Sequence, residues 1–193
     1  MGIKKPDFLS IKDYLDYEDS SQNKHEYEKG EILAMSGGTI NHGILCGNAY
    51  NELREGIRKS KIKCNTIGSE VRIHIKKTNS IVYPDAMVIC GEIEVSEDDK
   101  DAITNPVLVV EVLSKSTGDY DRGDKFYKYR QLDSFKEYIL IDQEKPVVET
   151  YYKKDDNSWE ILRVEGLDKM LDIKSIGIQI KMALLYEGVN WEE

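Results

Sequence analysis

Residues 106–114 read Pro106-Val107-Leu108-Val109-Val110-Glu111-Val112-Leu113-Ser114. Such a near-continuous run of β-branched and large apolar residues is typical of a strand that is buried on both faces. Glu111 interrupts the run, and alternation along a strand puts it on the same face as Val109 and Leu113. A carboxylate inside a buried strand is costly unless a metal ion or a charge partner compensates it. Glu111 therefore marks a candidate site.

A second stretch shows the same pattern and carries Asp85. It reads Ile81-Val82-Tyr83-Pro84-Asp85-Ala86-Met87-Val88-Ile89-Cys90. A carboxylate at a strand end is often only a cap or an ion-pair partner, so either acid alone leaves both interpretations open. Two such acids on successive strands, joined by one polar loop, favour a functional site, because perturbed acids cluster at functional sites.

The size and composition of the chain predict one soluble globular domain over residues 1–193. Of its 193 residues, 40% are hydrophobic and 33% are charged, which suits a single core. No apolar run reaches the roughly 18 residues of a membrane span, and the N-terminus lacks the apolar core of a signal peptide. We therefore expect no contact with a membrane.

Three cysteines, Cys46, Cys64 and Cys90, bear on the cellular compartment. Their number is odd, and no pair has the Cys-x-x-Cys spacing. This pattern predicts reduced, mostly buried thiols in a cytoplasmic protein.

The net charge of −9 counts against a protein that coats nucleic acid non-specifically, because phosphate contacts dominate such binding. It does not exclude a nuclease, since carboxylates at a metal site add negative charge that the ion offsets. Two groups of basic residues are candidates for a local basic face or for a merely solvated one: Lys59, Lys61 and Lys63, and Lys125, Lys128 and Arg130.

The remaining elements follow from periodicity and turn residues. We expect helices over about residues 11–18, 40–59, 119–131 and 182–186, and strands or hairpins near 25–35, 71–76, 137–142, 147–164 and 176–180. Alternation makes the strand at 71–76 half-exposed, and the acidic linker 91–105 is interpreted as a solvated loop. His42, in the first turn of the second helix, is interpreted as a cap or surface residue.

Two buried acids on adjacent strands, with a lysine nearby, are the requirements of metal-assisted phosphodiester hydrolysis. Hard oxygen ligands suit Mg²⁺ or Mn²⁺. The ion activates a water molecule and stabilises charge on the phosphate. A lysine can orient that water or neutralise the oxyanion.

The same residues also resemble a known pattern. Pro84-Asp85, followed by Glu111 in an apolar strand, resembles the PD-(D/E)xK nuclease pattern. A longer set of matching segments comprises residues 84–88, residues 106–117, Asp121, Lys125, Tyr129 and residues 137–142. On these segments, and on residues 26–31 and His42 upstream, the chain resembles the Uma2 family, also called DUF820, of restriction endonuclease-like proteins of bacteria. The resemblance covers about residues 10–190.

The resemblance implies an α/β (α+β) fold of the restriction-endonuclease-like type, with a mixed central sheet flanked by helices and a C-terminal β-hairpin extension. It implies that Asp85 and Glu111 bind Mg²⁺ or Mn²⁺, helped by the backbone carbonyl of Val112. An acid from the N-terminal part often completes such a site. The candidates for it are Glu26 first, then Glu28 and Glu31.

This chain departs from the superfamily pattern at one position. Leu113 stands two residues after Glu111, where the superfamily usually has lysine. The resemblance implies that Lys125, on the following helix, takes the lysine role and orients the attacking water. Lys115 is nearer in sequence and remains the alternative.

We therefore expect a Mg²⁺-dependent DNA endonuclease that forms a homodimer through exposed apolar strand edges. A nuclease fold with a lapsed site, serving as a binding or assembly module, is one alternative that the acidic charge and the missing lysine favour. A distance from Lys125 to the carboxylates that leaves no room for metal-bound water would also favour it. A metal-dependent hydrolase of a small phosphorylated substrate is the other alternative, and it would need a closed pocket rather than an open groove.

Overall fold

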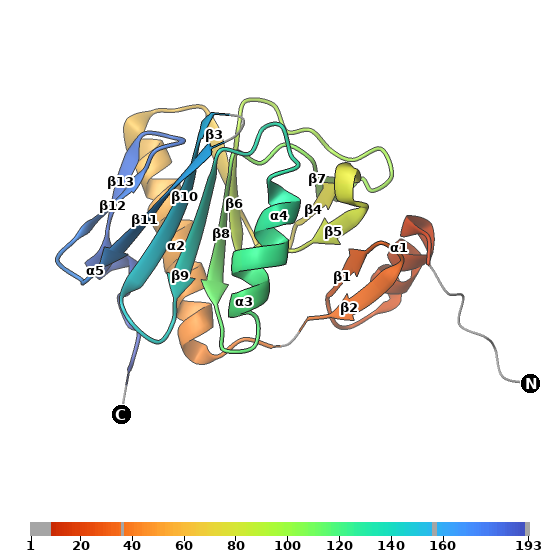
Figure 1. Cartoon of the computed structure of the whole chain (residues 1–193), viewed down its shortest axis with the longest axis horizontal. Helices are drawn as coiled ribbons and strands as arrows, with labels where there is room; N and C mark the ends of the chain where they lie inside the picture. Colours follow the sequence, from red (N-terminus) through yellow and green to blue (C-terminus); the bar gives the residue numbers. More distant parts are fainter. Residues whose placement is uncertain (1–8, 36, 156–157, 192–193) are drawn as a thin grey trace, which may run out of the picture.

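A mixed six-stranded sheet forms the centre of the computed structural model, which describes residues 9–35, 37–155 and 158–191 (Figure 1). The strand order is β11-β10-β9-β8-β6-β3. β8 and β9 are parallel, and the other neighbouring strands are antiparallel. The strands are β3 (Cys64–Gly68), β6 (Ala86–Cys90), β8 (Leu108–Leu113), β9 (Glu137–Asp142), β10 (Val147–Asp155) and β11 (Ser158–Glu165). The predicted hairpin at 147–164 is confirmed, and it extends the edge of this central sheet.

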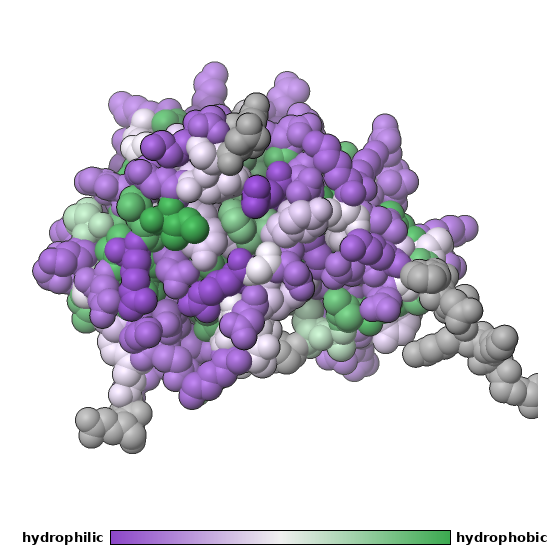
Figure 2. All heavy atoms as spheres, viewed as in Figure 1, coloured by the Kyte–Doolittle hydropathy of each residue, from purple (hydrophilic) through white to green (hydrophobic). Residues whose placement is uncertain are grey.

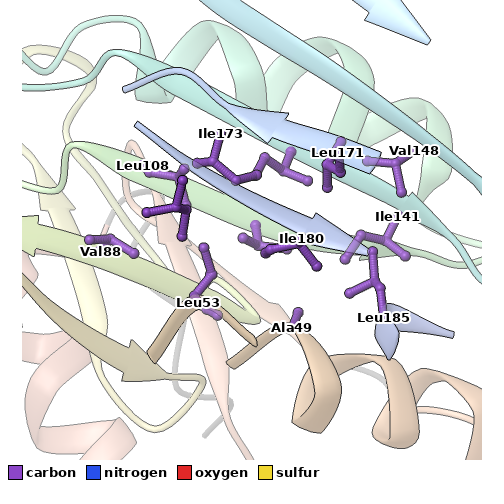
Figure 3. Close-up of a cluster of buried hydrophobic side chains, with 14 of the residues drawn as sticks. Ala49, Leu53, Val88, Leu108, Ile141, Val148, Leu171, Ile173, Ile180 and Leu185 are labelled. Carbon is purple, nitrogen blue, oxygen red and sulfur yellow. The ribbon is translucent and has the colours of Figure 1, made fainter. Parts of the chain in front are cut away.

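The long helix α2 (Ile40–Ser60) covers one face of the sheet together with C-terminal elements (Figure 3). These are the hairpin of β12 (Met170–Ile173) and β13 (Ile178–Lys181) and the short helix α5 (Met182–Leu185). The buried contacts of α2 come from one apolar stripe, which consists of Leu45, Ala49, Leu53 and Ile57. Alternate residues of β8 face this layer, namely Leu108, Val110 and Val112.

The opposite face of the sheet carries the helical segment predicted at 119–131 (Figure 1). It consists of α3 (Gly118–Tyr120), the π-helical turn η2 (Asp121–Lys125) and α4 (Phe126–Tyr129). Val109 and Leu113 of β8 pack on this side with Tyr129. Because side chains alternate along a strand, Glu111 faces the same helical segment, as its spacing predicted. Helices on both faces of a mixed sheet confirm the predicted fold class.

A second, five-stranded sheet lies beside the central one, with the order β2-β1-β5-β4-β7. Its strands are β1 (His25–Glu28), β2 (Glu31–Ala34), β4 (Arg72–Ile75), β5 (Ser80–Val82) and β7 (Ala102–Ile103), with the 3-10 turn η1 (Lys76–Thr78) between β4 and β5. The predicted hairpin near residues 25–35 is confirmed, and it turns at Lys29 and Gly30, whose φ angles are 49° and 98°. Helix α1 (Ile11–Ser20) begins at a capping box that Ser10 and Asp13 form.

The segment 91–105 differs from its prediction as a solvated loop. It contains β7, which pairs in parallel with β4, and Asp99, which is buried in an ion pair with Arg72. His74 Nδ1 forms a hydrogen bond with Ser96 Oγ at 2.6 Å. All four residues of β4 are therefore buried, and the prediction of a half-exposed strand was wrong, because polar partners on a distant segment cover its polar face.

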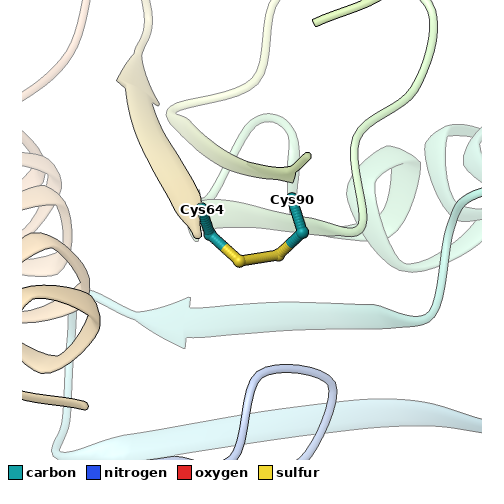
Figure 4. The surroundings of a disulfide bond; sticks show 2 residues. All are labelled: Cys64 and Cys90. Carbon is teal, nitrogen blue, oxygen red and sulfur yellow. A yellow bond between two sulfur atoms is a disulfide. The ribbon is translucent and has the colours of Figure 1, made fainter. Parts of the chain in front are cut away.

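The cysteine prediction was also wrong. Cys64 and Cys90 form a disulfide (Figure 4). They lie directly opposite each other in the antiparallel pair of β3 and β6, and this proximity depends on strand pairing that cysteine spacing does not reveal. Cys46 is the free cysteine. The argument for a reducing compartment loses its support, and a cytoplasmic location stays a prediction.

Hydrophilic residues cover most of the face shown in Figure 2, with smaller hydrophobic areas between them. Among the exposed large hydrophobic residues, Ile161 and Leu162 lie on the edge strand β11. In the part of the chain that the structure describes, no helix has both the length and the hydropathy of a membrane span.

We expect the Cys64–Cys90 disulfide to stabilise the fold by about 2–4 kcal/mol, because it closes a loop that the unfolded chain would otherwise leave open. Urea unfolding of the double variant Cys64→Ser/Cys90→Ser, against the oxidised wild type, measures this loss. Cys46→Ser is the matched control. Three free thiols in the unfolded, unreduced protein would contradict the disulfide.

Candidate active site

The register of two strands brings Asp85 and Glu111 together. In the antiparallel pair of β6 and β8, Ala86 lies opposite Val110. Asp85 precedes Ala86 and Glu111 follows Val110, so the two acids lie at the same level. Asp85 Oδ2 accepts a hydrogen bond of 2.7 Å from the backbone N–H of Val112. Asp85 itself is partly exposed and precedes β6, so its prediction as a residue inside a buried strand was wrong.

Lys125 provides the positive charge next to Glu111. Its Nζ lies 2.9 Å from Glu111 Oε1 and 3.3 Å from Glu26 Oε1. Asp121 Oδ1 is 3.9 Å away, and the carbonyl of Tyr83 accepts a hydrogen bond of 3.1 Å from the same nitrogen. Lys125 is 5% exposed and Glu111 is 3% exposed. Of the two lysines considered for the site, Lys125 is thus the one in contact with a predicted ligand.

Burial and charge act in opposite directions on this ion pair. Burial lowers the pKa of Lys125, but the carboxylates of Glu111, Glu26 and Asp121 outweigh it and hold that pKa well above its ordinary value. Burial raises the pKa of Glu111 well above its ordinary value, and the charge of Lys125 only partly opposes this effect. Burial likewise raises the pKa of Asp121. One lysine therefore serves several acids, and burial favours the protonated form of two of them, Glu111 and Asp121.

Glu26 reaches the site from the second sheet. Its Oε1 accepts a hydrogen bond from the backbone N–H of Tyr83 at 3.1 Å, and its Oε2 accepts one from the Tyr120 hydroxyl at 2.9 Å. The two alternatives do not take this position: Glu28 pairs with Lys128 at 2.6 Å, and Glu31 is exposed. Of the three N-terminal acids, Glu26 is the one that contacts Lys125.

Sequence reasoning missed His42, which it assigned to a cap or the surface. The side chain of Thr39 caps α2 by accepting a hydrogen bond from the His42 N–H at 3.1 Å. The ring then points at Asp85, with Nε2 3.5 Å from Asp85 Oδ2. The interaction with the Asp85 carboxylate raises the pKa of His42. Burial raises the pKa of Asp85, but His42 and the Val112 N–H outweigh it and lower that pKa.

Tyrosines are the other residues that sequence reasoning did not assign to the site. Tyr129 lies one turn after Lys125 and donates a hydrogen bond of 2.8 Å to Glu111 Oε1. Tyr120 lies close to the start of the same helical segment and donates to Glu26. The four-residue spacing of Asp121, Lys125 and Tyr129 places all three on one helix face, and this spacing was the available signal.

Glu26, His42, Asp85, Glu111 and Lys125 line a pocket of about 590 Å³, whereas Tyr129 lies behind its wall. Its walls come from β1, β2, the start of α2, β8 and the turn of residues 114–117. Lys115 lies in that turn at the rim, is exposed, and has its Nζ 3.4 Å from Glu144. Lys125, Lys128 and Arg130 do not form the basic face considered for them, because Lys125 and Lys128 are buried in ion pairs.

The donor chemistry fits a hard divalent ion. The contacts to Glu111 use Oε1 and those to Asp85 use Oδ2, so each carboxylate has a second oxygen to offer. In a strand, the N–H and C=O of one residue point to the same side, so the Val112 carbonyl also points toward Asp85. Oxygen donors of this kind suit Mg²⁺ or Mn²⁺.

The chain is similar to known proteins over most of its length. Residues 11–184 match the model of the Uma2 family, described as "Putative restriction endonuclease". Two proteins of Synechocystis sp. are similar. "Uncharacterized protein slr1290" is 35% identical over 94% of this chain and 93% of its own length, and "Uncharacterized protein sll1609" is 34% identical over 86% and 93%.

A solved structure shares the fold. It is the crystal structure of "a putative nuclease belonging to DUF820" from Anabaena variabilis, with a TM-score of 0.74 and 14% sequence identity. The similarity covers 94% of this chain and 99% of the other chain.

We expect Lys125→Met to lower the free energy of unfolding by about 3–5 kcal/mol, because it leaves Glu111 buried without its counter-charge. Urea denaturation measures the loss. Lys77→Met, which removes a lysine from an exposed ion pair with Asp133, is the matched control and should cost about 1 kcal/mol or less.

A double variant separates buried charge from lost packing. Lys125→Met/Glu111→Gln removes both charges, and Tyr129 can still donate to the new amide oxygen. We expect it to be more stable than Lys125→Met alone. Equal losses in Lys125→Met and Lys77→Met would contradict the role of Lys125 as counter-charge.

Proposed function

The chain belongs to the Uma2 family, and from this premise and the site geometry we propose that it is a metal-dependent DNA endonuclease. One observation carries the proposal: Asp85 and Glu111 meet at the ends of adjacent strands, beside a buried lysine that contacts Glu111 at 2.9 Å. Perturbed, closely spaced ionisable groups in a pocket are typical of catalytic sites.

In this proposal Asp85, Glu111 and the Val112 carbonyl hold Mg²⁺ or Mn²⁺. When bound, the ion supplies an activated water and charge stabilisation at the phosphate. Tyr129 fixes the orientation of Glu111 through its hydrogen bond to Oε1, and the Val112 N–H fixes Asp85 through Oδ2. The two carboxylates are therefore preorganised by the protein itself.

Lys125 has the position needed to act on the reacting groups. Contacts with Glu111 and Glu26 hold its ammonium group in place, and the raised pKa keeps it protonated. A protonated amine at this point would donate a hydrogen bond to the attacking water or to the phosphate oxyanion. Glu26 and the Tyr83 carbonyl fix the position of the Lys125 amine. A fixed amine suits the role of orienting a water or a phosphate oxygen.

The DNA backbone would approach the open side of the pocket, where the turn of residues 114–117 lines the rim. The hydroxyl groups of this turn and the exposed ammonium of Lys115 are groups that commonly contact phosphates. The negative charge of the chain opposes DNA binding, and a bound divalent ion would offset part of that repulsion at the site itself. Exposed Ile161 and Leu162 on the edge strand β11 support the homodimer as a further part of this proposal.

A second candidate function is a binding or assembly module with a lapsed site. The observation in its favour is the direct contact of Lys125 with Glu111, which leaves no space for a water between these two atoms. A hydrolase of a small phosphorylated substrate is the third candidate. The pocket volume of about 590 Å³ lies in the range of small-ligand sites and favours this third candidate.

Metal binding and DNA nicking, measured on matched variants, test the proposal. We expect calorimetry to detect Mg²⁺ or Mn²⁺ binding to the wild type, and supercoiled plasmid to be nicked in the presence of the ion. In Asp85→Asn, which can still accept the Val112 hydrogen bond, metal affinity should fall at least tenfold and nicking about a hundredfold. Asp133→Asn, which removes one exposed carboxylate outside the pocket, should behave as the wild type.

The other outcomes separate the candidates. The protein could bind metal and hydrolyse a small phosphodiester such as bis-p-nitrophenyl phosphate without nicking DNA. This result would favour the hydrolase of a small substrate over the DNA endonuclease. Absence of metal binding in the wild type would overturn the catalytic proposal and leave the binding module. Equal nicking by Asp85→Asn and the wild type would show that the activity arises elsewhere.

A further inference from the structure

The stripe with which α2 packs on the sheet changes its chemistry at one end. Toward the C-terminus of the helix it consists of Ala49, Leu53 and Ile57, all buried. Toward the N-terminus the stripe continues to the buried Leu45, and beside Leu45 the helix carries two polar residues, Cys46 and His42. These two residues are four positions apart and so lie on one helix face. Both residues lie at the end of the central sheet where Asp85 is located.

His42, Cys46 and Asp85 form a compact set of potential ligands. One ligand atom from each residue can be chosen so that the three lie within 4.8 Å of one another. Cys46 Sγ is 3.4 Å from His42 Nδ1, and Asp85 Oδ2 is 3.5 Å from the other ring nitrogen, Nε2. An ion binds only one of these nitrogens, so the ligand that contacts the other nitrogen must move toward it. With metal–ligand bonds of about 2.0–2.3 Å, tetrahedral ligand atoms lie roughly 3.5 Å apart, so closure on an ion needs side-chain shifts of roughly an ångström.

The backbone next to His42 is shaped to admit its ring. A Cβ atom at Gly38 would lie 2.9 Å from His42 Nδ1, which is closer than a real contact allows. Gly38 therefore lets the chain before α2 pass directly over the imidazole. The N-cap hydrogen bond from the His42 N–H to Thr39 fixes the start of the helix at the same place. These two features hold His42 beside Cys46 and Asp85 before any ion binds.

We propose that His42, Cys46 and Asp85 form a second metal site, selective for a borderline ion such as Zn²⁺. Imidazole and thiolate are ligands that Zn²⁺ prefers and Mg²⁺ does not. Binding replaces the proton of the Cys46 thiol, which passes to solvent. Two ligands from consecutive turns of one helix and a third from a neighbouring strand leave the fourth tetrahedral position for a water.

The second site shares Asp85 with the Mg²⁺ centre of the proposed function. A Zn²⁺ ion that engages Asp85 withdraws that carboxylate from the arrangement with Glu111. Zn²⁺ at the second site therefore inhibits the Mg²⁺-dependent reaction. This last step rests on the proposed function, whereas the binding of Zn²⁺ does not.

Cobalt spectroscopy tests the site without any need for activity. Co²⁺ is a spectroscopic substitute for Zn²⁺, and a cysteine ligand gives a charge-transfer band in the near ultraviolet. We expect this band when the metal-free, unreduced protein is titrated with Co²⁺. It should disappear in Cys46→Ser, and the Co²⁺ affinity should fall at least tenfold in His42→Gln.

Two matched variants keep the assignment specific. Cys64→Ser/Cys90→Ser should retain the band, because the disulfide sulfurs are not thiolates. Glu111→Gln, verified as folded by circular dichroism, should also retain it, because Glu111 belongs only to the Mg²⁺ centre. No band in the wild type, or a band that persists in Cys46→Ser, would overturn the proposed site.

Inhibition is tested separately. Zn²⁺ should inhibit Mg²⁺-dependent nicking by the wild type, and Cys46→Ser should need at least tenfold more Zn²⁺ for the same inhibition. Equal inhibition of both proteins would overturn the competition between the two sites. Absence of nicking under all conditions, together with an intact Co²⁺ band, would count against the nuclease and in favour of the metal site.

Discussion

The buried charge of Glu111 is the constraint on which the rest of the structure depends. Removing a carboxylate from water is costly, and a lone one inside a sheet is not tolerated. The protein compensates it with the Lys125 ammonium and the Tyr129 hydroxyl, both within 2.9 Å of Oε1. Both partners come from one helical segment, which must therefore pack on this face of the sheet. The charge requirement and the apolar packing of Val109 and Leu113 act in the same direction.

Tyr83 connects this cluster to the second sheet. Its carbonyl accepts from Lys125 and its N–H donates to Glu26, while its hydroxyl donates to Glu18 of α1 and accepts from Arg72 of β4. Arg72 in turn pairs with the buried Asp99. A chain of charged and hydrogen-bonded groups thus runs from the site through the N-terminal elements. The second sheet does more than cover the core, because it supplies Glu26 and restrains Tyr83, two residues before Asp85.

The two faces of the central sheet contribute different chemistry to one end of it. The face of α3, η2 and α4 brings Lys125 and Tyr129 to Glu111, whereas the face of α2 brings His42 and Cys46 to Asp85. Because the two acids lie at the same level of β6 and β8, oxygen donors and softer nitrogen and sulfur donors meet at a single pocket. This meeting of donors is the basis of the competition between ions that we propose.

Local sequence determined the elements and marked part of the site. Apolar runs specified β6, β8 and β9, the capping box specified α1, and the two acids and Lys125 were recognisable because they interrupted patterns or matched a family motif. Only tertiary structure decided the pairings. Strand register made Cys64 and Cys90 partners and buried β4 under Asp99 and Ser96, and helix packing turned His42 from a cap into a neighbour of Asp85. Periodicity reports which face a residue occupies, but which residue lies across from it depends on contacts between segments far apart in the chain.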